Sequence, residues 1–124
     1  MKIVDANLVL RYLLNDIEDQ AKEAFSILNS GGSISLLNEV IAEIVYVLEK
    51  VYKVDRNKIC NELKDLIESD NIIVDNIDVM SYALDVFSKT RLDFIDTLLC
   101  AYAKVIDATI YTFDKKLLNA MKER

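Results

Sequence analysis

Apolar residues along the chain alternate between short continuous runs and longer repeats with a spacing of three or four. The short runs are rich in β-branched and aromatic residues, which is typical of strands, and they occupy residues 1–4, 33–37, 71–74 and 109–113. The longer repeats predict helices at residues 8–14, 17–28, 38–50, 55–68, 78–88, from 92 onward, and 115–122. In the helix that begins near residue 92, the residues expected to share one face are Ile95, Leu98, Leu99 and Tyr102.

This order of elements predicts an α/β fold. Two helices follow each of the first three strands, and one helix follows the last. Helices between successive strands favour a mostly parallel sheet with helices on both faces, a three-layer α/β/α arrangement. The chain contains no repeat and no interdomain linker. We therefore expect residues 1–124 to form a single domain.

Composition and charge limit the class of protein. Of the 124 residues 52% are hydrophobic, but no apolar run approaches the ~20 residues needed to span a bilayer. Strand-like sequence follows directly after Met1, which leaves no room for a signal peptide, so we expect a cytoplasmic protein. The net charge of −6 argues against tight nucleic-acid binding by charge alone. It does not exclude a nucleic-acid enzyme whose metal ion carries the positive charge.

Missing residue types remove several mechanisms. The chain has no histidine, and Cys60 and Cys100 have no neighbouring cysteine. Ser-His-Asp and Cys-His catalysis are therefore excluded, as is a zinc site of the usual nitrogen and sulfur ligands. We expect both cysteines to pack as small apolar residues. Any metal here should have oxygen ligands, which favours Mg²⁺ or Mn²⁺.

Acidic residues stand where the predicted strands end. Asp5 follows the first strand, Asp114 follows the last, and Asp93 and Asp96 lie three residues apart at the start of a helix. Ligands of parallel α/β sheets bind beyond the carboxyl ends of the strands, so these acids are expected to form a metal site. Asp5 alone also fits a second interpretation, in which it only caps the following helix.

Glu43 is the one acid that falls within a predicted core stripe. The apolar members of this stripe are Val40, Ile44, Val47, Leu48 and Val51. A buried carboxylate without a partner is costly, so it needs a cation or hydrogen bonds. A functional role and a structural salt bridge both satisfy this requirement, and we favour the functional role.

The chain resembles the PIN domain and, within it, the VapC-like toxins of toxin–antitoxin pairs. The resemblance covers nearly the whole chain and rests on three segments: IVDANLVLRYLL at the start, NEVIAEIVYVLEKVYKVDRNKI around Glu43, and LDFIDTLLCAYAKVIDATIYTFDKKL at the end. It implies a parallel sheet of order 3-2-1-4. A fifth edge strand, common in the family, is expected to be missing because the last pattern is helical.

The resemblance also implies roles for individual residues. Asp5, Glu43, Asp96 and Asp114 match the family's catalytic metal-binding positions, and Asp93 matches an additional acid that is often present in such sequences. Asn7 and Thr112 match polar positions that orient the carboxylates. Ala6 departs from the pattern, because the family often carries Thr or Ser there.

The implied activity is that of an endoribonuclease dependent on Mg²⁺ or Mn²⁺, which cleaves structured RNA with metal-activated water. The implied partners are RNA, a cognate antitoxin and a second copy of the chain in a homodimer. Five basic residues are either contacts to the RNA backbone or ordinary surface charges: Arg11, Lys89, Arg91, Lys115 and Lys116.

Two other functions remain open on the sequence. A receiver-type phosphoacceptor domain is also α/β and binds Mg²⁺, and Asp75 follows the third strand as its acceptor would. It needs two adjacent acids after the first strand, where only Asp5 stands. The second alternative is a PIN-like chain that binds without catalysis, although the presence of all four acids argues against it.

Overall fold

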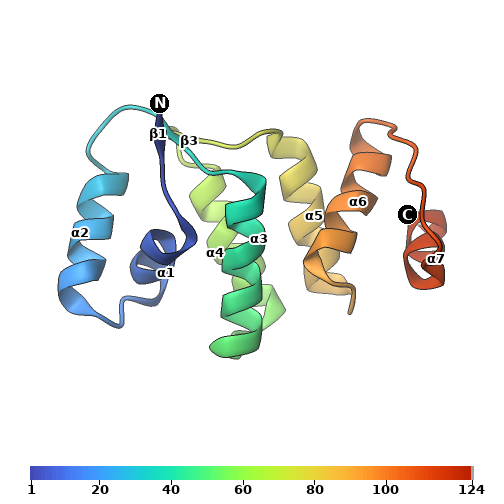
Figure 1. The fold of residues 1–124 in the computed structure, drawn as a ribbon, viewed down its shortest axis with the longest axis horizontal. Coiled ribbons are helices and arrows are strands. Elements are labelled where there is room, and N and C mark those ends of the chain that lie inside the picture. Colours follow the sequence, from blue (N-terminus) through green and yellow to red (C-terminus); the bar gives the residue numbers. More distant parts are fainter. Residues whose placement is uncertain (124) are drawn as a thin grey trace. The chain divides into compact units, whose positions relative to one another are not determined.

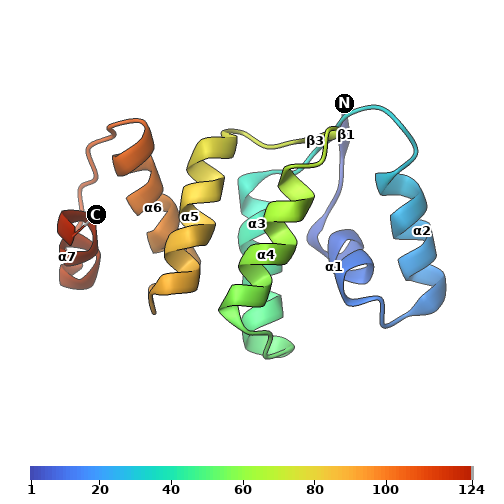
Figure 2. The same ribbon diagram turned by 180° about the vertical axis from the view of Figure 1, so that it is seen from behind.

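The computed structural model describes residues 1–123; Arg124, the last residue of the predicted domain, lies outside them. The described chain forms two compact units, residues 1–75 and the residues from Asn76 on. Figure 1 and its reverse view, Figure 2, label their elements. No helix among residues 1–123 has the length and apolar character needed to cross a membrane.

The N-terminal unit contains a parallel sheet of three two-residue strands in the order β1-β2-β3, as predicted for this part of the sheet. The strands are β1 (Lys2–Ile3), β2 (Ile34–Ser35) and β3 (Ile72–Ile73). Ile34 and Ile72 lie on one face of the sheet and are buried, whereas Ile3 and Ile73 on the opposite face are about half exposed. The helices of this unit therefore cover one face of the sheet.

Four α-helices follow these strands in the N-terminal unit. They are α1 (Ala6–Leu14), α2 (Glu18–Leu28), α3 (Asn38–Tyr46) and α4 (Arg56–Ile67). The predicted helix over residues 38–50 is present, but after Tyr46 it continues as a π-helical turn, η1 (Val47–Val51). In this turn the backbone N–H of Tyr52 donates to the carbonyl of Val47, at 3.1 Å.

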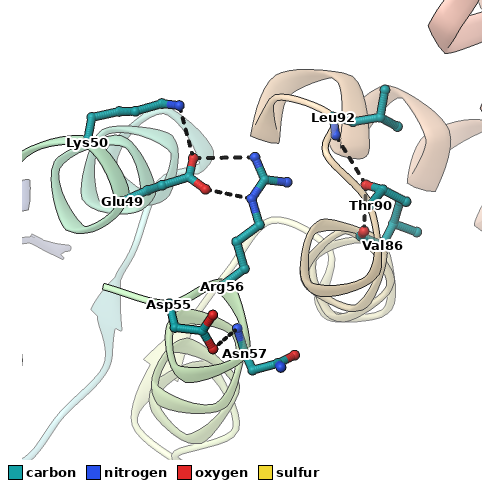
Figure 3. Close-up of polar contacts among 8 residues, drawn as sticks. All are labelled: Glu49, Lys50, Asp55, Arg56, Asn57, Val86, Thr90 and Leu92. Carbon is teal, nitrogen blue, oxygen red and sulfur yellow. Dashed lines mark hydrogen bonds and ion pairs between the residues drawn. The ribbon is translucent and has the colours of Figure 1, made fainter. Parts of the chain in front are cut away.

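A half-buried ion pair links η1 to α4. Arg56 Nε donates to Glu49 Oε2 at 2.5 Å, and Lys50 Nζ lies 3.6 Å from Glu49 Oε1. Asp55 caps α4 by accepting from the backbone N–H of Asn57. Figure 3 shows these contacts. They fix the direction in which the chain leaves η1.

The C-terminal unit is helical. Its elements are α5 (Ile77–Lys89), α6 (Phe94–Val105) and α7 (Lys115–Glu123); α5 and α6 lie side by side in both ribbon views. Phe87 and Phe94 meet edge to face with their ring centroids 5.9 Å apart. The Thr90 hydroxyl donates to the carbonyl of Val86 and accepts from the N–H of Leu92, which joins the end of α5 to the approach of α6 (Figure 3).

The face that α6 buries includes only part of the predicted set, because Leu98 is buried but Ile95 is not. The buried residues of this helix are Phe94, Thr97, Leu98, Cys100 and Ala101, whereas Ile95 is 55% exposed. Both stripes fit a helical period, and the contact between Phe94 and Phe87 selects the one that turns Ile95 outward. Cys60 and Cys100 are both buried, as predicted.

The predicted fourth strand is also wrong. Residues 107–114 form neither helix nor strand, so the described chain lacks the last position of the expected order 3-2-1-4. Ile110 packs on the apolar cluster formed by Val86, Leu92, Cys100 and Leu117. Tyr111 and Phe113 are 92% and 102% exposed. High strand propensity reflects packing on a sheet, and within residues 1–123 this segment has no hydrogen-bonded neighbour strand.

Candidate metal centre

Asp5 stands between β1 and α1 and caps the helix. Its backbone is extended, and its side-chain Oδ1 accepts from the N–H of Leu8 at 2.9 Å. The buried side chains of Val4 and Ala6 on either side fix this position. Asp5 therefore caps α1, as expected, and this cap is compatible with a further role in a metal site. The cap occupies one carboxylate oxygen, and the second oxygen takes no part in this bond.

Glu43 is exposed, which corrects the prediction that it is a buried acid. The buried side chains of α3 are those of Ile41, Ile44 and Val45, and Glu43 projects beside them. A solvated carboxylate does not require a compensating cation. The argument from burial therefore fails for Glu43, and its candidacy depends on its neighbours instead.

Those neighbours include Asp5. A cavity of about 400 Å³ in the N-terminal unit has five polar side chains in its lining: Asp5, Asn7, Arg11, Glu43 and Tyr52. Apolar residues complete the wall: Ala6, Leu10, Val47 and Val51. Two of the predicted carboxylates and the predicted orienting residue Asn7 thus share one cavity.

Arg11 forms the basic part of this lining. Its guanidinium donates to Asp16 Oδ2 and to the Tyr52 hydroxyl, each at 3.2 Å. The hydrogen bond to Tyr52 raises the pKa of Arg11, burial opposes this effect, and the negative charge of Asp16 adds to it. Arg11 therefore stays fully charged, and its charge is compensated within the unit.

The acids of the C-terminal unit gather at the start of α6. Asp93 occupies the N-cap position without a side-chain capping bond, and Asp96 lies half-buried in the first turn. Burial raises the pKa of Asp96, the negative charges of Asp114 and Asp93 raise it further, and Lys116 opposes them. Asp93 and Asp114 thus lie close enough to Asp96 to disfavour ionisation of its carboxylate.

Asp114 caps α7, much as Asp5 caps α1. Its Oδ1 accepts from the backbone N–H groups of Lys116 and Leu117, at 2.9 and 3.3 Å. The Thr112 hydroxyl accepts from the N–H of Asp114 at 3.0 Å. Thr112 therefore holds the backbone of Asp114. The prediction was that Thr112 orients the Asp114 carboxylate directly, so its observed influence is more indirect.

The donor types suit a hard divalent cation, because carboxylate and amide oxygens are the ligands that Mg²⁺ and Mn²⁺ prefer. Asp5, Asn7 and Glu43 line one cavity in the N-terminal unit, and in the C-terminal unit Asp93 and Asp114 lie close enough to Asp96 to raise its pKa. Among residues 1–123, no three acidic or cysteine side chains approach closely enough to hold an ion between them. The chemistry of the set therefore fits the metal, and each unit brings part of it together.

Tyr52 is the cavity residue that the sequence did not single out. It reaches Arg11 only through the π-helical turn, which the spacing of apolar residues does not reveal.

Of the basic candidates other than Arg11, Lys116 acts on the charge of Asp96, whereas Lys89, Arg91 and Lys115 are exposed. A larger cavity, about 600 Å³ beside Tyr12 and Phe25, has only Glu62 as an acid in its lining.

Comparison with known proteins identifies the family. The model of the PIN domain matches residues 2–123, and the match spans both units. Neither the curated proteins nor the solved structures contain a significant match to the chain. Because the PIN domain model covers residues 2–123, the receiver-type alternative, with Asp75 as phosphoacceptor, is wrong. The chain belongs to the PIN domain family, a family of metal-dependent nucleases.

Proposed function

We propose that this protein is a metal-dependent endoribonuclease that cleaves structured RNA and acts as the toxin of a type II toxin–antitoxin pair. Membership of the PIN family supplies the nuclease chemistry. The VapC-like segments around Asp5, Glu43 and Asp96 support the more specific role. The observation that carries the proposal is the shared cavity of Asp5 and Glu43, two acids far apart in the sequence.

The metal-binding carboxylates are those of Asp5, Glu43, Asp96 and Asp114, with Asp93 as an additional ligand. When bound, Mg²⁺ or Mn²⁺ lowers the pKa of a water molecule and offsets the charge of the scissile phosphate. Asp5 and Asp114 each use one oxygen as a helix cap. These caps hold the two carboxylates in place before a metal binds.

Charge repulsion supports the metal-binding role in the C-terminal unit. Asp114 and Asp93 both make ionisation of Asp96 less favourable. A divalent cation relieves such repulsion, because its positive charge offsets the negative charges of the ionised carboxylates. The half-buried position of Asp96 strengthens this effect.

The proposed partners follow from the same acidic groups. An antitoxin that places an arginine or lysine among these carboxylates competes with the metal and forms charge-assisted hydrogen bonds. Homodimerisation is part of the proposal through the VapC-like resemblance, and symmetric pairs are the commonest assembly of soluble proteins.

The test is cleavage of structured RNA, such as a tRNA pool, by the purified chain. We expect cleavage with Mn²⁺ or Mg²⁺, none with EDTA, and a loss of roughly 100-fold or more in Asp5→Asn. Asp65→Asn, at an exposed position of α4, is the matched control and should cleave normally. Sequencing the new RNA ends identifies the substrate. RNA binding without cleavage under any metal condition would support the inactive-module alternative and contradict the proposal.

A further inference from the structure

Arg11 connects three segments of the N-terminal unit. It stands in the last turn of α1. Its guanidinium reaches Asp16, just beyond that helix, with the nearest nitrogen–oxygen distance 3.1 Å. On the other side it donates to the Tyr52 hydroxyl, 3.2 Å away and directly after η1. One side chain thus ties the helix capped by Asp5 to the end of the helix that carries Glu43.

The guanidinium is held in this position at a cost. The Arg11 side chain is only 11% exposed, and its buried Nε atom has no hydrogen-bond partner among the described residues. A buried donor without a partner is unfavourable, and such a group in a folded protein calls for an explanation. If the contact between Arg11 and Tyr52 served stability alone, a hydrogen-bond partner for Arg11 Nε would make the folded protein more stable.

The π-helical turn brings Tyr52 to Arg11. The bond from Tyr52 N–H to the Val47 carbonyl spans five residues, one more than in an α-helix. The additional residue changes the direction in which the next side chain projects, and such turns are frequent at functional sites. Here the turn begins one helical turn after Glu43, and both Tyr52 and Arg11 then line the cavity of Asp5 and Glu43.

We propose that Arg11 and Tyr52 are positioning residues whose side-chain contact fixes Asp5 and Glu43 relative to each other and thereby sets the affinity of this cavity for a divalent cation. The inference rests on the proposed function, because it assumes that Asp5 and Glu43 bind metal. It assigns a role to two residues that do not themselves provide carboxylate ligands.

Two physical effects lead to this role. Ligands that are already in place lose less freedom when the ion binds, so a rigid pair binds more tightly than a mobile one. Asp16 and Tyr52 also occupy donors of the guanidinium. Without the Tyr52 hydroxyl, the guanidinium loses one of its two partners and is held less firmly beside Asp5 and Glu43 in the cavity lining.

The test is to titrate the full chain with Mn²⁺ alone and to measure the binding affinity by calorimetry. Tyr52→Phe removes only the hydroxyl, and we expect Mn²⁺ affinity to fall about 10- to 100-fold, as when residues that orient metal ligands are changed. Tyr46→Phe is the matched control, because Tyr46 is 62% exposed and ends α3. It should bind Mn²⁺ like the wild type.

A second variant distinguishes positioning from simple stabilisation. Arg11→Lys keeps the charge but cannot reach Asp16 and Tyr52 together in a planar fork. We expect it to weaken Mn²⁺ binding as Tyr52→Phe does, and the double variant to be no weaker than the single ones. A merely structural contact would lower the melting temperature of the metal-free protein and leave the Mn²⁺ affinity of the folded chain unchanged.

The outcomes separate this inference from the proposed function. Equal Mn²⁺ affinity in Tyr52→Phe and Tyr46→Phe, with normal RNA cleavage in both, would overturn the positioning role and leave the nuclease proposal intact. Absence of Mn²⁺ binding by the wild type would overturn both. If Tyr52→Phe does not fold, Arg11→Lys provides the same comparison.

Discussion

Asp114 lies close enough to Asp96 to disfavour ionisation of its carboxylate, although Asp114 precedes α7 and Asp96 lies in the first turn of α6. Burial is the largest cause of the raised pKa of Asp96, and the negative charges of Asp114 and Asp93 add to it. The C-terminal unit thus holds a carboxylate whose ionised form is disfavoured in the metal-free protein. This relationship has a direct consequence for stability.

The first prediction concerns the pH dependence of stability. The ordinary pKa of an aspartate carboxyl group is 3.8, and the folded state raises it for Asp96. Between pH 3.8 and this raised pKa, Asp96 binds more protons in the folded state than in the unfolded state. The free energy of unfolding therefore falls as the pH rises through this window. Asp96→Asn removes this contribution, so it should make the metal-free protein more stable at neutral pH. The gain should vanish below pH 3.8, as measured by urea denaturation.

The matched control for Asp96 is Asp78→Asn. Asp78 also lies in the first turn of its helix, α5, but it is exposed. An acid at a helix start is favoured by the helix dipole, so this substitution should not raise stability. A large loss of stability in Asp96→Asn at neutral pH would instead mean that the Asp96 carboxylate makes an essential structural contact.

The second prediction separates the two roles of Asp5. Asparagine caps a helix about as well as aspartate, whereas alanine does not. Asp5→Asn should therefore unfold like the wild type in EDTA, and Asp5→Ala should lose about 1 kcal/mol. Both variants should lose RNA cleavage. Normal cleavage by Asp5→Asn would show that the cap is the only role of this residue.

The third prediction concerns metal and stability. A cation that binds only the folded state adds RT ln(1 + [L]/Kd), about 2.7 kcal/mol at 100 times Kd. Mn²⁺ should therefore raise the melting temperature of the wild type, and Asp96→Asn should show a smaller increase or none. Differential scanning calorimetry with and without EDTA measures this effect. An equal increase in both proteins would place the ion elsewhere.

The sequence predicted most elements of this fold, because apolar periodicity reports the side of a helix or strand that packs. The helices around Ala6, Asn38 and Ile77 all form close to the expected residues. The run from Thr109 to Phe113 failed as a strand, because strand formation needs a neighbour that local sequence cannot specify. The exposure of Ile95 was missed for a similar reason, since packing chose between two equally regular stripes.

The candidate site was predicted in part. Placement of Asp5 and Asp114 at helix starts followed from local patterns, and the structure shows both as caps. Glu43 was assigned through a burial that the structure does not have, yet it shares a cavity with Asp5. The contact between Arg11 and Tyr52 was not predictable, because it depends on a π-helical turn that leaves no clear mark in the sequence.

The last prediction concerns inhibition by the proposed antitoxin. If a basic side chain of the antitoxin occupies the carboxylates that bind the metal, the two compete, and a higher Mn²⁺ concentration should weaken inhibition. A small protein encoded immediately upstream would be the first inhibitor to test, and its co-expression should then abolish cleavage. Replacing its arginines and lysines one at a time by alanine should restore cleavage for the residue that enters the site. Inhibition that does not change with Mn²⁺ concentration would show that the antitoxin blocks RNA access from another surface, because a ligand that leaves the carboxylates free does not compete with the ion.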